Sequence, residues 1–523
     1  MNKIEVSIWE DEYWYAAEVT EGINMPFNAE SDIERDIRVA GTENQTSPFL
    51  ISTKGRYIWS KDGFVYRVKK GKIKCKNSPM KHDIEIFDGY RSLKGAYLNA
   101  CARFFPPDGK HPNELMFRYP QYCTWIALGA EQTEEGIIDY AKSIVDSGMP
   151  VGELIIDDGW QENFGSWDFD AKKVPHPKAL VKTLHEMGFK VILWICPFVN
   201  RDAIDYDYLK YGDLLVKKRS GKIAFRKWWN GKDALIDMSN PSSREWFKSK
   251  CDYLMNEYGV DGFKQDAGDA FYYKDSDITY NAVDANAESK LWCESARSLD
   301  FNEIRACFKC GGMGIAQRLC DKRHSFTDNG LEQLVPNALM QGILGYPYSC
   351  PDMIGGGAIG DFRGRDESEF DMELFVRYAQ ASALMPMMQY SFPVWKLKNK
   401  RIAELCKEAA AIHEEYSDYI MKLVKTASRT GEPIVRYLAY EFPHEEFEKV
   451  NDMFMLGDKY LVAPVTVKGQ YEKEIRLPEG HWKYVDGNVY SGTVTVGTPI
   501  EILPVFERLD EENRLLGIRK KYN

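Results

Sequence analysis

The sequence predicts an α/β protein, a (β/α)₈ TIM barrel flanked by an N-terminal and a C-terminal β-sandwich. First, 523 residues exceed what one ordinary core can hold. Second, both ends of the chain consist of short alternating segments, whereas the middle alternates apolar strands with amphipathic helices. Third, acidic residues recur where the middle strands end, the position at which barrels carry their chemistry. We therefore expect domains over residues 1–115, 116–425 and 426–523.

The first domain is predicted to be all-β, because its short apolar segments alternate with polar positions and are separated by turn residues. The turn sequence KDG at residues 61–63 predicts a hairpin between the last two of its strands. The expected strands are 3–9, 13–19, 49–52, 56–60 and 64–68.

The middle domain is predicted to contain eight strands over about 300 residues, which is the count and size of a (β/α)₈ barrel. Clear strands are expected at 123–128, 153–156, 190–196, 260–265 and 304–308, with further strands ending near 325–329 and 351–356 and a last one within 384–390. A doubly wound open sheet is the alternative, but no Gly-rich phosphate loop follows the first strand.

Helices are expected between these strands. One is capped by Thr133, one covers residues 177–187, and another starts with a capping box of Ser242 and Glu245 and stops at Gly259. An apolar helix follows at 331–344, and a long helix at 401–425 closes the domain.

The last domain returns to a β pattern. Strands are expected at 434–438, 454–456, 460–465 and 474–477, with one more from residue 482. No low-complexity linker separates the three domains, so they are expected to pack against one another.

The composition of the chain limits the classes of binding partner that we expect. A net charge of −11 without a basic tract makes nucleic acid and anionic membranes poor partners. No run approaches the roughly 18 apolar residues of a membrane span, and the N-terminus lacks an apolar signal core. Eleven scattered cysteines suit buried thiols, so a cytoplasmic location is expected. The sequence leaves open whether the protein forms a homo-oligomer.

No metal or cofactor is expected. Cys307 and Cys310 form the only C-x-x-C, and without a second pair this spacing does not predict a zinc or redox site.

The strand ends of the predicted barrel carry carboxylates, and none carries a Ser or Cys nucleophile with a His base. Tryptophans at Trp160, Trp194 and Trp229 are expected to be exposed beside them. Paired carboxylates with aromatic platforms indicate acetal chemistry on a sugar, although several aspartates at one mouth also suit Mg²⁺ or Ca²⁺. The carboxylates are Asp157 and Asp158, Asp266 and Asp269, Asp328, and Asp352.

Residues 260–269, VDGFKQDAGD, resemble the nucleophile motif of glycoside hydrolase family 31, a strand reading D-G-x-K-x-D-x-G-E. The resemblance spans about residues 48–507. It includes WICPF at 194–198, WNG at 229–231, DMSNP at 237–241 and, near the C-terminus, GEPIVR at 431–436, MFMLG at 453–457 and LVAPV at 461–465. Residues 351–356, PDMIGG, are most similar to the α-galactosidase-like branch of the family.

This resemblance implies a retaining mechanism with Asp266 as nucleophile and Asp328 as general acid/base. It makes Asp157 a ligand of remote sugar hydroxyls, with Asp158 beside it as a further reader of the hydroxyl pattern. The residues implied to line the first sugar subsite are Trp194, Trp229, Lys264 and Asp352.

The sequence departs from the family pattern at three places. Asp269 replaces the usual Glu, Phe326-Thr327-Asp328 replaces W-x-G-D, and Pro351 replaces the His of many α-glucosidases. The family's second C-terminal β-domain is expected to be missing.

The implied function is an exo-acting α-glycosidase for a neutral hexoside, with α-galactosides favoured over α-glucosides or α-xylosides. A neutral sugar is expected because no arginine cluster stands among the matched motifs, although Arg318 can approach the site. An inactive sugar-binding protein is the alternative from another functional class.

Overall fold

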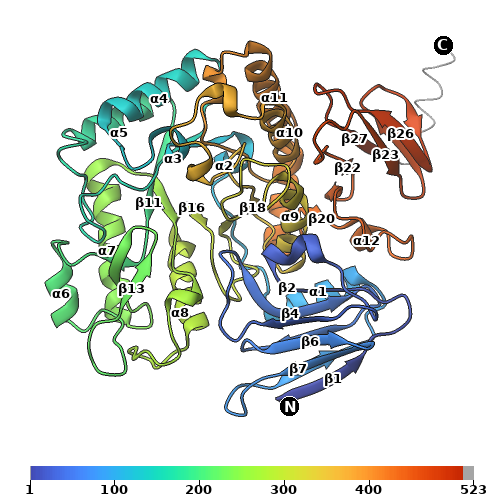
Figure 1. The fold of residues 1–523 in the computed structure, drawn as a ribbon, viewed down its shortest axis with the longest axis horizontal. Coiled ribbons are helices and arrows are strands. Elements are labelled where there is room, and N and C mark those ends of the chain that lie inside the picture. The colour runs from blue at the N-terminus through green and yellow to red at the C-terminus, as the bar shows by residue number, and fades with distance from the viewer. Residues whose placement is uncertain (1, 510–523) are drawn as a thin grey trace.

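The computed structural model describes residues 2–509. Figure 1 shows a central barrel, with the N-terminal strands in blue below it and the C-terminal strands in red at its side. Within the described residues, none of the helices combines the length and the apolar character needed to cross a bilayer. The predicted fold class is confirmed.

The N-terminal region consists of two antiparallel four-stranded sheets. One sheet has the order β1(Lys3–Ser7), β7(Lys72–Lys76), β6(Val65–Lys69), β3(Ile33–Asp36). The other has the order β2(Trp14–Glu18), β4(Thr46–Ser52), β5(Tyr57–Ser60), β8(Ile84–Phe87). The predicted hairpin at 61–63 is wrong, because β5 and β6 belong to different sheets and this turn crosses between them. The helix α1(Leu93–Phe104), which was not predicted, follows the second sheet.

The barrel contains eight strands, and every pair of neighbours is parallel. Nearly all of their residues are buried, as expected where helices cover a parallel sheet. In spatial order the strands are β18(Ser349–Cys350), β17(Ala316–Arg318), β16(Phe301–Ile304), β15(Gly262–Gln265), β11(Lys190–Ile195), β10(Glu153–Ile156), β9(Gln121–Cys123) and β19(Gln389–Tyr390).

Amphipathic helices connect the strands. The cap at Thr133 is confirmed, since its side chain accepts a hydrogen bond from the Gly136 amide. The predicted capping box at Ser242 is wrong, because Asn240 caps this helix and Pro241 occupies its first turn. Gly259 ends it in the left-handed conformation, as predicted. The helices are α4(Glu134–Asp146), α5(Pro177–Glu186), α7(Pro241–Tyr258), α8(Ala285–Glu294), α9(Leu334–Ile343), α10(Met372–Ala383) and α11(Lys400–Thr430).

Three predicted strands of the barrel are misplaced. The first strand was predicted at 123–128, but it ends at Cys123 and is followed by the short helix α3(Trp125–Leu128). The fifth strand was predicted at 304–308, but it ends at Ile304. The sixth strand is β17, which ends well before residues 325–329. Strands this short contain too few residues for an apolar period to locate them.

An insertion after β11 forms a small antiparallel sheet beside the barrel mouth. It comprises β12(Phe198–Val199), β14(Gly231–Leu235) and β13(Phe225–Trp228), with the short helix α6(Tyr206–Tyr211).

The C-terminal region has a six-stranded and a two-stranded sheet. The larger has the order β20(Val435–Arg436), β21(Phe454–Leu456), β22(Tyr460–Val462), β27(Val505–Leu509), β24(His481–Tyr484), β25(Val489–Tyr490); the smaller pairs β23(Glu472–Arg476) with β26(Thr493–Gly497). The predicted domain boundaries stay predictions, and the one at residue 425 falls inside α11.

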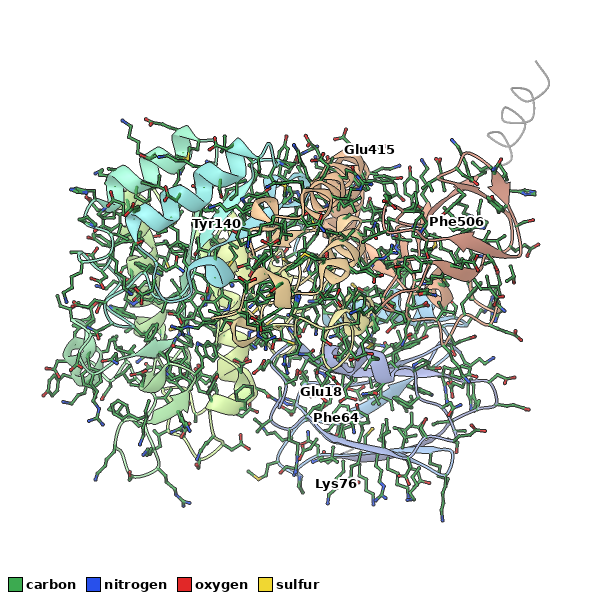
Figure 2. All side chains as sticks on the ribbon, turned by 45° about the horizontal axis from the view of Figure 1, so that its top comes forward. Glu18, Phe64, Lys76, Tyr140, Glu415 and Phe506 are labelled. Atoms are coloured by element: carbon green, nitrogen blue, oxygen red, sulfur yellow. The ribbon has the colours of Figure 1, made fainter. Side chains whose placement is uncertain are left out.

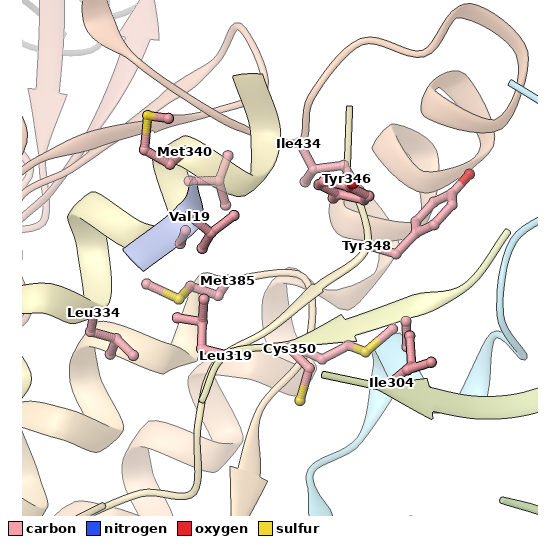
Figure 3. Close-up of a cluster of buried hydrophobic side chains, with 14 of the residues drawn as sticks. Val19, Ile304, Leu319, Leu334, Met340, Tyr346, Tyr348, Cys350, Met385 and Ile434 are labelled. Carbon is pink, nitrogen blue, oxygen red and sulfur yellow. The ribbon is translucent and has the colours of Figure 1, made fainter. Parts of the chain in front are cut away.

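The three regions share one continuous apolar core. Figure 3 shows Val19 of the N-terminal region beside Met340 of α9, with Ile434 close to Tyr346. Figure 2 shows the side chains of the whole molecule, with Tyr140 in the barrel region and Phe506 in the C-terminal sheet, and both residues belong to this core. Such packing holds the N-terminal region against the barrel, where it contributes to the site described next.

Candidate active site

Asp266 lies directly after β15, at the carboxyl end of the barrel. Its amide donates to the Ile195 carbonyl (2.9 Å), which fixes the backbone beside β11. The next two residues, Ala267 and Gly268, have left-handed φ values of 54° and 72°. A side chain on Gly268 would meet Trp292, because an added Cβ would lie 2.2 Å from the indole. The sharp turn therefore needs its glycine, and it directs the Asp266 carboxylate toward the mouth.

Three side chains contact the Asp266 carboxylate. Trp194 Nε1 lies 3.1 Å from Oδ2, and Arg305 Nε lies 2.9 Å from Oδ1. Arg318 Nη2 is 4.0 Å from Oδ2. Burial would raise the pKa of Asp266, but the charges of Arg305, Arg318 and Lys264 outweigh it and hold the pKa well below its usual range. Asp266 is therefore ionised at neutral pH.

Arg305, which the sequence reasoning missed, also binds Asp269. Its Nη1 and Nη2 lie 3.2 and 3.1 Å from the two oxygens of that carboxylate. Burial raises the pKa of Asp269 to about 6, against the lowering effect of Arg305. Asp269, which stands where the family motif has Glu, thus makes a bidentate contact that orients the arginine beside the nucleophile. Arg305 was missed because the strand was predicted at 304–308, which put this arginine inside it, whereas β16 ends at Ile304 and leaves Arg305 at the carboxyl end of the barrel.

Arg318, the last residue of β17, connects four carboxylates. Its guanidinium lies 2.8 Å from Asp321, 3.1 Å from Asp352 and 3.1 Å from Glu303, besides its contact with Asp266. Burial, followed by the charge of Asp321, raises the pKa of Asp352 to about 7. Arg318 thus joins the ends of strands β15 to β18 into one charged network.

Asp328 is not brought into this network. It lies exposed at the tip of a loop, with φ 54°, and the described hydrogen bond of its carboxylate is a long one from Thr327 (3.4 Å). The neighbouring Asn329 instead supports the loop, because its Nδ2 donates to the Asp321 carbonyl (3.2 Å). Asp321, which the sequence reasoning missed, is the partly exposed carboxylate that shares Arg318 with Asp266.

Asp157 and Asp158 follow β10 and point to different partners. Asp157 Oδ2 accepts from Lys264 Nζ (2.8 Å), while Asp158 Oδ2 accepts from Asn230 in the inserted sheet. Burial and the charges of Asp157 and Asp266 raise the pKa of Asp158 to about 7. Burial would lower the pKa of Lys264, but the charge of Asp157, together with smaller contributions from Cys123 and Glu303, outweighs it and raises that pKa.

The tryptophans have different roles from those predicted. Trp160 and Trp194 are 0% and 2% exposed, so the expectation of exposed platforms is wrong for both. Trp160 Nε1 donates to the Trp194 carbonyl (2.7 Å) and so supports the strand that presents the Trp194 indole to Asp266. Trp229 is 48% exposed and is the one of the three that offers an open aromatic face.

The N-terminal region reaches into the barrel through residues 43–46. Gln45 Nε2 donates to the carbonyls of Arg305 and Arg318, and Asn44 Nδ2 also donates to the Arg318 carbonyl (3.1 Å). Glu43 accepts from Arg305 Nη1 through its carbonyl (2.6 Å). This segment therefore fixes both arginines of the network. No sequence pattern could have revealed it, since the contact spans two regions.

The carboxylates of this mouth contact guanidinium, ammonium and amide groups, and four of them share the Arg318 guanidinium. Such an arrangement differs from the all-oxygen cage of a Mg²⁺ or Ca²⁺ site. It provides an ionised carboxylate and a second, partly exposed carboxyl beside it, which is the pair needed for glycoside cleavage.

Comparison with known proteins agrees with this geometry. The model for the glycosyl hydrolases family 31 TIM-barrel domain matches residues 116–301, and that for the glycosyl hydrolase family 31 C-terminal domain matches residues 431–511. The myogenesis-regulating glycosidase of Mus musculus is 31% identical over 76% of this chain and 57% of its own length. Alpha-glucosidase 2 of Bacillus thermoamyloliquefaciens is 23% identical over 75% of this chain and 53% of its own length.

The chain thus spans little more than half the length of these two relatives. Among solved structures, the GH31 dextranase of Flavobacterium johnsoniae has a TM-score of 0.84 at 21% identity, covering 97% of this chain and 66% of that one. Its fold is therefore shared over nearly all of the residues that the structure describes. With family matches over both the barrel and the C-terminal sheets, the chain belongs to glycoside hydrolase family 31.

Proposed function

We propose that the protein is a retaining, exo-acting α-glycosidase that hydrolyses terminal α-linked neutral hexosides. The observation that carries this proposal is the ionised Asp266 carboxylate, held by Trp194, Arg305 and Arg318 at the carboxyl end of the barrel. A carboxylate that is oriented and kept unprotonated suits attack on an anomeric carbon.

In the first step the Asp266 oxygen forms a bond to the anomeric carbon as the bond to the leaving oxygen breaks. A carboxylic acid delivers its proton to that oxygen, and then, as a carboxylate, takes a proton from the water that releases the sugar. Two inversions give net retention of the α configuration.

We assign the acid/base role to Asp321 in place of Asp328. Asp321 shares the Arg318 guanidinium with the nucleophile and keeps 41% of its side chain exposed, so a leaving group and a water can reach it. Asp328 is exposed as well, but it lacks the contact with Arg318, and its described hydrogen bond lies outside the network.

A neutral sugar is favoured by the state of the two arginines. In contrast to the expectation from sequence, Arg305 and Arg318 both stand beside the nucleophile, but each is already ion-paired with more than one carboxylate, which compensates its charge. A sulfonate or carboxylate on the substrate would therefore meet negative charge without a free cation to bind it.

Within neutral sugars, we propose an α-galactoside, with an α-glucoside or an α-xyloside as the alternative. The support is the similarity of residues 351–356 to the α-galactosidase-like branch of the family, and Asp158 with Asn230 as a polar pair able to discriminate one hydroxyl. Trp229 offers the open face on which the sugar or its aglycone would stack.

The experiment is a panel of aryl α-glycosides with galacto, gluco and xylo configuration, with NMR of the first-formed anomer. We expect the highest kcat/KM for the galactoside and an α-configured first product. A β-configured first product would contradict the mechanism, whereas a higher kcat/KM for the glucoside would change only the substrate. Inactivity on all three with retained sugar binding would favour a sugar-binding protein.

A further inference from the structure

Three buried cysteines from two segments meet behind the active site. Cys293 lies on α8, and Cys307 and Cys310 lie on the segment that follows β16. Their Sγ atoms are all within 4.8 Å of one another, and the three residues are 0%, 2% and 1% exposed. Among the described residues this is the one group of three potential metal ligands with so short a spacing.

The C-x-x-C segment is held in a shape that turns both of its thiols inward. Lys309, between the two cysteines, has a left-handed φ of 57°, which a residue with a side chain rarely adopts. Two backbone hydrogen bonds to Thr46 of the N-terminal region maintain this turn, from Thr46 N to the Cys307 carbonyl (2.9 Å) and from Lys309 N to the Thr46 carbonyl (2.8 Å). The site is therefore preorganised by the docking of two regions.

The surroundings are suited to sulfur carrying negative charge. Gln317 Nε2 donates to Cys293 Sγ (3.8 Å), and Cys307 Sγ donates to the Tyr346 hydroxyl (3.7 Å), which can turn its own hydrogen toward the sulfur once that sulfur is a thiolate. The ammonium groups of Lys290 and Lys309 act electrostatically on the same cluster. Polar donors and cations around a set of thiols are what a buried thiolate site requires.

We propose that Cys293, Cys307 and Cys310 form a three-sulfur site for one thiophilic metal ion, Cu(I). With metal–sulfur bonds of about 2.3 Å, three thiolates around one ion lie about 4 Å apart, so only a small contraction of the present cluster is needed. Soft thiolates select Cu(I), and a set of three suits its trigonal coordination, whereas structural Zn²⁺ sites take four ligands.

Binding is a ligand exchange without electron transfer. Three S–H bonds break, the three protons pass to solvent, and three S–Cu bonds form. One monovalent cation on three thiolates leaves two negative charges, within the electrostatic influence of Lys290 and Lys309. A divalent ion on the same three thiolates would leave only one negative charge.

The site adjoins the catalytic network through the chain. Cys307 is two residues after Arg305, and Gln317 directly precedes Arg318. A bound ion would therefore stiffen the two segments that carry the arginines of Asp266. The proposal does not rest on hydrolytic activity, because it concerns ligands that lie outside the sugar site.

The test uses the whole chain, expressed in copper-supplemented medium and purified without oxygen. We expect one copper per chain by elemental analysis, retained against a Cu(I) chelator, and an X-ray absorption spectrum with three sulfur ligands. Single changes Cys293→Ser, Cys307→Ser and Cys310→Ser should each lower the copper content at least tenfold. The matched controls are Cys251→Ser and Cys406→Ser, which alter buried free cysteines elsewhere.

The spectrum of the unmodified chain keeps the test independent of how well the variants fold. No copper in that chain, two sulfur ligands, a disulfide within the cluster, or four-coordinate Zn²⁺ bound in preference to Cu(I) would each overturn the assignment. A copper content of Cys293→Ser equal to that of the unmodified chain would also overturn the assignment. The Asp266→Ala variant should bind copper as the unmodified chain does, which separates this site from the proposed hydrolase function.

Discussion

Asp266 and Asp321 contact the same guanidinium, Asp321 at 2.8 Å from Nη1 of Arg318 and Asp266 at 4.0 Å from its Nη2. One arginine thus holds two carboxyl groups on one side of the mouth. The two differ in access, because the Asp266 side chain is 13% exposed and that of Asp321 is 41% exposed. This difference suits a shielded nucleophile and an acid that must reach a leaving group and water.

Removal of the nucleophile should abolish turnover without unfolding the chain. Asp266→Ala is expected to lower kcat by about 10³-fold or more, because the covalent intermediate can no longer form. Added azide should then attack from the vacated face and release a β-glycosyl azide, measured by NMR. An α-glycosyl azide, or kcat within tenfold of the unmodified enzyme, would remove Asp266 from this role.

Substitution of Asp321 and of Asp328 should show which of the two carboxyl groups is the general acid/base. Asp321→Ala should lower kcat/KM by about 10²- to 10⁴-fold on a substrate with a poor leaving group, and much less on a dinitrophenyl glycoside that needs no proton. Azide should rescue its second step and give the α-glycosyl azide.

Asp328→Ala is the matched control for that substitution, and its kcat/KM should stay within about twofold of the unmodified value. The reverse pattern, with Asp328→Ala impaired and Asp321→Ala active on all leaving groups, would restore the assignment made from sequence.

The charge of Arg305 should set the acid limb of the pH profile. Arg305→Gln removes a cation that lowers the pKa of Asp266, so this pKa rises although Arg318 and Lys264 remain. The acid limb of kcat/KM should therefore move to higher pH by about one unit or more. Arg323→Gln, which removes an arginine paired with Asp361, should leave the limb in place. An unmoved limb in Arg305→Gln would contradict the electrostatic role.

The contact of Gln45 with the barrel should matter for catalysis. Gln45→Met leaves the carbonyls of Arg305 and Arg318 without this donor, at a cost of about 1–3 kcal/mol, so kcat/KM should fall about tenfold.

Glu12→Gln is the control for that variant, because Glu12 forms a buried ion pair with Arg56 in the same N-terminal region. It should lower the melting temperature and leave kcat/KM within about twofold. Equal losses of kcat/KM in both variants would mean that Gln45 acts only through stability.

Glu288 should make stability depend on pH. Burial, followed by the charge of Asp237, raises the pKa of Glu288 to about 9. Between its usual pKa of about 4.5 and about 9 the unfolded chain releases this proton and the folded chain keeps it, so stability falls as pH rises, by a few kcal/mol.

Glu288→Gln removes that proton linkage. Its melting temperature should exceed that of the unmodified chain at pH 9, and the difference should vanish near pH 4.5. The exposed Glu10→Gln should show no such trend. A constant difference between Glu288→Gln and the unmodified chain over this range would contradict the raised pKa.

Much of the architecture followed from local patterns. The strand 153–156, the cap at Thr133 and the stop at Gly259 were predicted to the residue, because apolar runs, N-cap side chains and left-handed glycines act over a few neighbours. The strands β17 and β18 were misplaced or shortened, since two or three residues carry no readable period.

The sequence by itself determined the barrel between two β-rich regions and the place of Asp266, whose strand, glycine turn and acidic neighbour are contiguous in the chain. Only the tertiary structure decided which carboxylate faces it, because Asp321 and Asp266 meet through Arg318, and Arg305 and Gln45 arrive from other strands and another region. Likewise, Cys293 joins the C-x-x-C only after α8 packs on the barrel. Contacts between distant segments depend on how elements pack, and that information is not carried by the spacing of residues along the chain.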